Sequence, residues 1–95
     1  LYDIIEELEK IPKDYSGMER HTAIDVFTNI SLTLKHTYMY NDNLREMLPE
    51  IVESLNIQAD ALESIKPRSL EYIKPMLDCM VSVIDKSVKV IKKYY

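Results

Sequence analysis

Apolar residues recur along this chain with the spacing of amphipathic helices. The pattern predicts a short first helix over about residues 1–11, with apolar positions at Leu1, Ile4, Ile5, Leu8 and Ile11. Pro12 and Gly17 interrupt it, and a second helix is expected to begin near Met18. On that second helix one stripe is formed by Ala23, Phe27, Ile30, Leu34 and Tyr38.

A third helix is predicted after Asn41, Asp42 and Asn43, whose short polar side chains favour turns and helix starts. Its apolar positions are Leu44, Leu48, Ile51, Leu55, Leu62 and Ile65. Pro49 allows two starts, because a proline is accepted in the first turn of a helix or inside it at a kink. The sequence leaves both starts open.

The strongest periodicity belongs to the last helix, which is expected to start at a Ser69 cap, to bend at Pro75 and to run to the end. Its main stripe comprises Leu70, Ile73, Leu77, Met80, Ile84, Val88, Ile91 and Tyr95. A second stripe, about a third of a turn away, comprises Met76, Cys79, Val83, Val90 and Tyr94. So wide an apolar perimeter predicts contact with at least two neighbours, within one bundle or across an oligomer interface.

These elements predict an all-α protein, namely a four-helix bundle with a short first helix and antiparallel neighbours. A three-helix bundle with a loose N-terminal turn is the alternative. No run alternates with the period of a strand, so no sheet is expected. One domain over residues 1–95 is expected from the length.

Composition narrows the classes of partner and compartment. The formal net charge is −4, which disfavours nucleic acid because phosphate neutralisation by basic groups supplies most non-specific affinity. Residues 1–63 hold 13 acidic and five basic side chains, whereas residues 64–95 hold three and seven. The lone Cys79 suits a reducing compartment, so a cytoplasmic location is expected. No apolar run is long enough to span a membrane, although peripheral contact stays open. Because the sequence begins with Leu1 and not with methionine, the possibility that it is part of a longer chain is left open.

Catalytic constellations are not apparent in the sequence. A single glycine cannot build a phosphate-binding loop, and neither histidine follows a glutamate at the spacing of di-metal bundles. Cys79 lies between Asp78 and Met80, neighbours that do not stabilise a thiolate. We therefore expect no enzyme activity, no catalytic or metal-binding residues and no cofactor.

Two surfaces remain as candidates for binding. Lys86, Lys89, Lys92 and Lys93 lie in the last turns of the final helix, where they either complement the helix dipole or dock an anionic partner. A second patch on the second helix would combine Leu32, His36, Met39 and Tyr40.

The sequence thus predicts a non-enzymatic, helical protein–protein interaction module. We expect it to associate with itself as a homodimer through the second stripe of the final helix, Met76, Cys79, Val83, Val90 and Tyr94. The alternative is a monomeric binding or immunity-type protein that acts on a protein or membrane surface through the lysine stripe.

Overall fold

The computed structural model describes residues 2–11, 17–40 and 43–95, with side chains for all of these except 2, 17–19 and 38–40. Four α-helices span Tyr2–Glu9 (α1), Gly17–Tyr40 (α2), Leu44–Ile65 (α3) and Lys74–Lys92 (α4). A single 3₁₀ turn, η1, covers Lys66–Arg68. The described residues contain no β-strand, and the predicted all-α class is confirmed.

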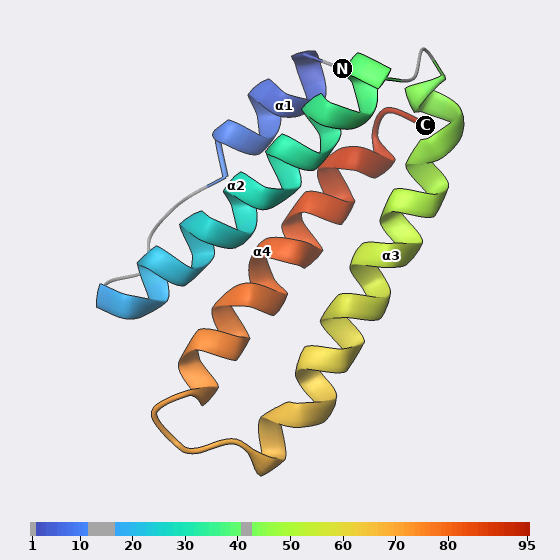
Figure 1. Cartoon of the computed structure of the whole chain (residues 1–95). Helices are drawn as coiled ribbons and strands as arrows, with labels where there is room; N and C mark the ends of the chain where they lie inside the picture. The colour runs from blue at the N-terminus through green and yellow to red at the C-terminus, as the bar shows by residue number, and fades with distance from the viewer. Residues whose placement is uncertain (1, 12–16, 41–42) are drawn as a thin grey trace.

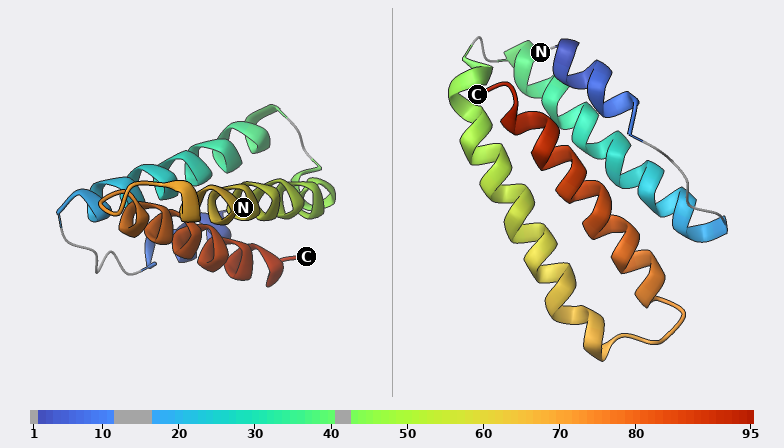
Figure 2. Two further views of the ribbon diagram at one scale, coloured as in Figure 1. Left: turned by 90° about the horizontal axis from the view of Figure 1, so that it is seen from below. Right: turned by 180° about the vertical axis from the view of Figure 1, so that it is seen from behind.

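The helices form an up-down-up-down bundle in which α1 and α3 run opposite to α2 and α4 (Figure 1). In both the front and rear views α4 lies between α2 and α3, while the short α1 lies beside the C-terminal half of α2 (Figure 2). Helix α4 packs against α1, α2 and α3. Consecutive helices are antiparallel as predicted, but the closely packed pair of α2 and α4 runs parallel.

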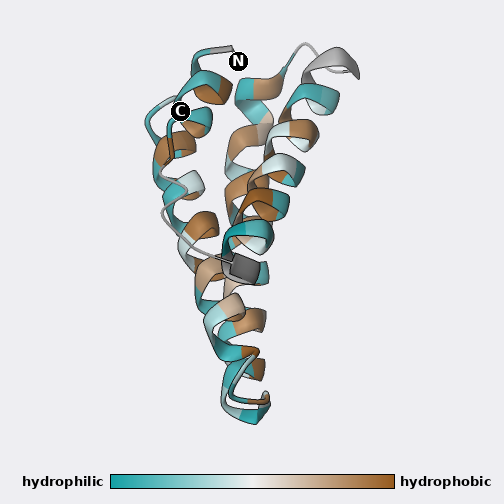
Figure 3. Ribbon diagram, turned by 90° about the vertical axis from the view of Figure 1, so that its left-hand side faces the viewer, coloured by the Kyte–Doolittle hydropathy of each residue, from teal (hydrophilic) through white to brown (hydrophobic). Residues whose placement is uncertain are grey.

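The core consists of buried apolar residues from all four helices. The ribbon coloured by hydropathy shows apolar residues recurring along the helices between hydrophilic ones (Figure 3). The predicted stripe of α2 is confirmed at its described positions, since Ala23, Phe27, Ile30 and Leu34 are all buried. On α3 the buried residues are Leu44, Leu48, Val52, Leu55 and Ala59. Toward the C-terminal end of α3 the predicted stripe therefore leaves the core, and Ile65 is 49% exposed.

Both apolar stripes of α4 contribute to the core of a single chain. Its buried residues are Leu77, Cys79, Val83, Ile84, Ser87, Val88 and Ile91. Cys79 is 6% exposed and Val83 is 2% exposed, which corrects the interface role predicted for these two residues. The physical reason is the central position of α4, which has neighbours on several sides. Met76, Val90 and Tyr94 from the same predicted stripe are only partly buried.

The start of α4 differs from the prediction. Ser69 does not cap α4; it ends η1, where its hydroxyl donates to the Ile65 carbonyl at 2.9 Å. Helix α4 begins at Lys74, and Pro75 occupies its first turn, where the missing N–H of proline costs no helical hydrogen bond. Pro75 is therefore a starting residue of the helix and is not a bend within it. Leu70 precedes the helix and is 59% exposed.

The start of α3 is decided in favour of Leu44. Pro49 lies inside this helix, on its exposed side. Proline has no N–H, so the Arg45 carbonyl lacks its usual helical partner. Because Pro49 faces solvent, water can satisfy that carbonyl and the helix continues to Ile65.

Ile91 is buried and Leu70 is exposed, although the sequence pattern places both on the main stripe of the last helix. This difference in burial can be tested by substitution. We expect Ile91→Ala to lower the free energy of unfolding by about 2 to 5 kcal/mol, since Ile91 is fully buried. Leu70→Ala should change it by less than about 0.5 kcal/mol. Urea unfolding followed by circular dichroism measures both, and equal losses would contradict the described start of α4.

Candidate functional site

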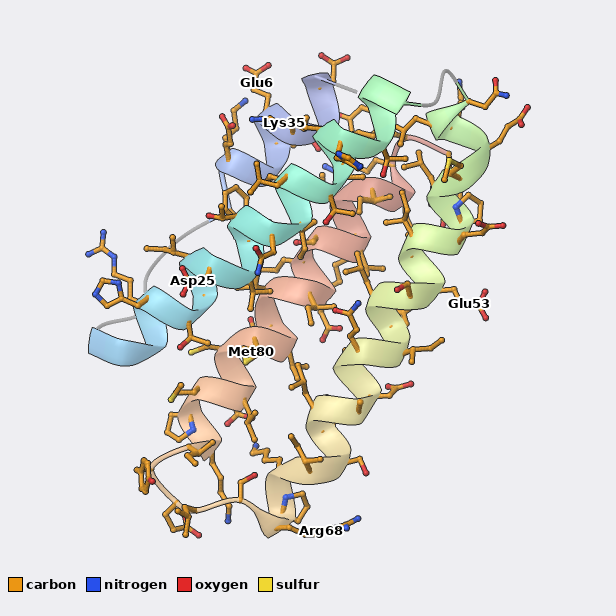
Figure 4. The ribbon with its side chains drawn as sticks, in the orientation of Figure 1. Glu6, Asp25, Lys35, Glu53, Arg68 and Met80 are labelled. Atoms are coloured by element: carbon orange, nitrogen blue, oxygen red, sulfur yellow. The ribbon has the colours of Figure 1, made fainter. Side chains whose placement is uncertain are left out.

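Helices α2 and α3 diverge and leave a groove between them. Among the described residues α2 packs closely against α4, makes a smaller contact with α1 and makes very few contacts with α3. The resulting hollow has a volume of about 660 Å³. Its floor is formed by Met80 and Ile84 of α4, and Figure 4 shows Met80 between the two flanking helices.

The two walls of the groove come from side chains at helical spacing. The α2 wall consists of Val26, Asn29, Ile30, Thr33 and Leu34. The α3 wall consists of Ile51, Ser54, Leu55, Gln58, Ala61, Leu62 and Ile65. None of these residues, and neither floor residue, carries a charge. The groove is thus a neutral and largely apolar surface open to solvent.

Three polar side chains of the walls, Thr33, Ser54 and Gln58, form hydrogen bonds within their own helices. The Thr33 hydroxyl donates to the Asn29 carbonyl at 2.8 Å. On α3 the Gln58 amide lies 3.5 Å from the Ser54 hydroxyl. Since these groups already have local partners, they demand little from an occupant, and apolar contact dominates what the groove can offer.

The same residues explain why the groove stays open. Where α2 and α3 face each other, they present Asn29 and Thr33 on one side and Ser54, Gln58 and the small Ala61 on the other. Such side chains bury little apolar area, so closing the gap would gain little free energy. Sequence reasoning did not find this site. The available signal was the series of small or polar residues at positions 54, 58 and 61, beside the apolar stripe of α3.

Part of the second predicted patch lies beside the groove. Leu32 follows Asn29 by three residues and His36 follows Thr33 by three, which places both along one edge of the α2 wall. Both side chains are exposed, as was predicted for Leu32. The Met39 and Tyr40 side chains, which completed the predicted patch, lie outside the described residues. On α3 the exposed Ile57 precedes Ala61 by one turn and extends the apolar surface over the opposite edge.

The predicted lysine stripe lies on a different face, beside α1. Lys86, Lys89 and Lys93 line a hollow of about 360 Å³ together with Glu7, Lys10, Ile11 and Val90. The Lys93 ammonium lies 3.6 Å from a Glu7 carboxylate oxygen. Lys92 is exposed and does not line this hollow. The stripe is thus partly neutralised by the acidic first helix of the same chain.

Tyr94 belongs to the same end of α4 and is partly buried. Burial raises the pKa of its phenol above 10.0, and the nearby carboxylates of Glu7 and Asp3 raise it further. The charged form of Tyr94 is therefore disfavoured by the fold.

Neither a metal-binding cluster nor a membrane-spanning helix is found among the described residues. No group of three His, Cys, Asp or Glu side chains in this part of the chain is arranged to hold a metal ion. No described helix combines the length and the apolar character needed to cross a bilayer. The groove between α2 and α3 is the candidate functional site on the described surface.

Comparisons with known proteins were made at three levels. No protein-family model, no curated protein and no solved structure matches the chain. The function must therefore be inferred from the groove and from the charges around it.

The environment of Tyr94 gives a prediction for alkaline pH. In the unfolded chain the tyrosine loses its proton near pH 10.0, whereas the folded protein retains it to higher pH. The contribution of Tyr94 to stability should consequently be intact below pH 10.0 and be lost as the pH rises further, because the unfolded state then binds fewer protons at this residue. We expect Tyr94→Phe to make this decline shallower, as measured by urea unfolding from about pH 9 to about pH 11. Identical declines in the two proteins would contradict the described environment.

Proposed function

We propose that this protein is a non-enzymatic interaction module that holds an amphipathic helix of a partner protein in the groove between α2 and α3. The observation that carries the proposal is a neutral, largely apolar groove with helical walls and an apolar floor at Met80 and Ile84. Helix-in-groove docking uses such a surface, and the occupant contributes apolar residues at i, i+3, i+4 and i+7.

The dimensions of the groove suit a helix of moderate length. The α3 wall runs from Ile51 to Ile65, a rise of about 21 Å along a helix. An occupant of about 15 residues, or four turns, would match this length. Seated there, it would pack on α4 between α2 and α3, in the position where those two helices fail to meet each other.

The chemistry of the groove favours binding over catalysis. Its lining holds no Asp, Glu, His, Cys, Lys, Arg or Tyr side chain, so the groove offers no acid or base of the usual catalytic kinds. A small-molecule site of similar volume normally combines apolar walls with convergent polar groups. The long, largely apolar lining therefore supports a helical occupant.

The structure favours the groove over the two surfaces of α4 that the sequence predicts for binding. Cys79 and Val83 are buried in the core, so the second stripe of α4 is not free for self-association. A second copy of the chain would have to use the groove instead. Binding through the lysine stripe would have to compete with Glu7, which already lies beside Lys93. Docking in the groove requires neither exposure of core residues of α4 nor separation of Lys93 from Glu7.

A designed peptide tests the proposal directly. The probe is a fluorescent peptide of about 15 residues with leucines at helical spacing and glutamine on both flanks. We expect saturable binding by fluorescence anisotropy and about tenfold weaker binding to Ala61→Trp, because the exposed Ala61 gives way there to a side chain that fills the groove. Thr28→Trp is the matched control on the exposed surface of α2 outside the groove lining, and it should bind the peptide like the parent protein.

Circular dichroism verifies that both tryptophan variants keep their helices. Absence of saturable binding would contradict the proposal, as would equal affinity of Ala61→Trp and Thr28→Trp. Light scattering adds a further outcome. A dimer mass that Ala61→Trp converts to a monomer mass would assign the groove to a second copy of this chain and overturn the proposed heterologous partner.

A further inference from the structure

The edges of the groove carry acidic side chains on both walls. Asp25 precedes the wall residue Asn29 by four positions, and Glu50 precedes the wall residue Ser54 by four positions. Residues four apart lie on the same face of a helix, so each carboxylate stands one turn from the groove lining. Both side chains are exposed, and neither forms an ion pair with a basic side chain in the described part of the chain.

Basic residues are scarce along these edges. Lys35 of α2 lies on the side toward α1, and Arg68 lies beyond the lower end of the α3 wall (Figure 4). Elsewhere on α3 there are four acidic side chains, Glu46, Glu53, Asp60 and Glu63, and one basic side chain, Arg45. Figure 4 shows Glu53 on the outer edge of α3, away from α4. Asp25 and Glu50 therefore give the two edges of the groove a negative potential that an occupant would meet on both sides.

We infer, resting on the proposed function, that the occupant is a partner-protein helix whose apolar stripe is flanked on both sides by lysine or arginine. The apolar stripe would contact Met80, Ile84 and the walls, while the basic flanks would face Asp25 and Glu50. Exposed ion pairs add little affinity individually, but complementary rims select among partners and accelerate association.

The same charges argue against a second copy of this chain as the occupant. Of its helices, α3 exposes apolar Ile57 beside the acidic positions Glu50 and Glu53, which would face the acidic rim of another copy. Helix α4 carries exposed lysines at Lys89 and Lys92, but most of its apolar residues are committed to the core. Neither α3 nor α4 therefore combines a free apolar stripe with basic flanks.

Three peptides that share one leucine stripe and differ only in their flanks test this inference. One carries lysine, one glutamine and one glutamate. We expect the lysine peptide to bind about tenfold more tightly than the glutamate peptide at low salt, with the difference shrinking as salt is raised. In the double variant Asp25→Lys, Glu50→Lys the order of the peptides should reverse.

A matched double variant, Asp60→Lys with Glu63→Lys, separates the rim from the total charge. It changes the net charge by the same amount at exposed positions that do not line the groove, so the lysine peptide should keep its preference over the glutamate peptide. Reversal in this control to the same extent would overturn the role of Asp25 and Glu50.

The failure of this inference is distinguishable from failure of the proposed function. Equal affinity for the three peptides, all weakened by Ala61→Trp, would overturn the basic flanks and leave the groove as a helix-docking site. If no peptide binds saturably, both proposals are wrong. A dimer mass that Ala61→Trp abolishes would overturn the partner-protein helix in favour of a second copy.

Discussion

The structure depends on the burial of α4 among the other three helices. This helix carries apolar side chains over well more than half its circumference, and Cys79, Val83 and Ile84 all enter the shared core. Burial of that area is the main favourable term available to a chain of 95 residues, which has one small core. The other helices are arranged by what they cover on α4. Since α2 and α3 each pack against it, neither has to pack closely against the other.

The groove is a consequence of this division of contacts. Helix α3 turns its most apolar positions to α4, and on the side toward α2 it presents Ser54, Gln58 and Ala61. On the facing side, helix α2 presents Asn29 and Thr33, and the Thr33 hydroxyl donates to the Asn29 backbone carbonyl. Two such surfaces bury too little apolar area to close on each other, yet both flank the apolar Met80 and Ile84. A third helix with its own apolar stripe could supply the missing area, which connects the fold to the proposed function.

Charge is distributed over the bundle with the same asymmetry that the sequence shows. The basic end of α4 lies beside α1, where Lys93 approaches Glu7, and where burial and the nearby carboxylates raise the pKa of the Tyr94 phenol. The acidic side chains of α3 have no comparable internal partner on the groove side, because the α2 edge adds Asp25 where a base would be needed. The lysines are therefore partly satisfied within the chain, whereas the rim of the groove keeps an unbalanced negative charge that a partner can use.

The sequence by itself determined the helical class, the short first helix, the buried stripe of α2 and the outward position of Leu32, because helical periodicity is a local property. It left the start of α3 open and misplaced that of α4, where Pro75 suited both a kink and a first turn. Only the tertiary structure decided that Cys79 and Val83 are core residues and that α2 and α3 stay apart. Periodicity shows how wide an apolar face is, but the helix that covers it is set by packing between segments distant in sequence.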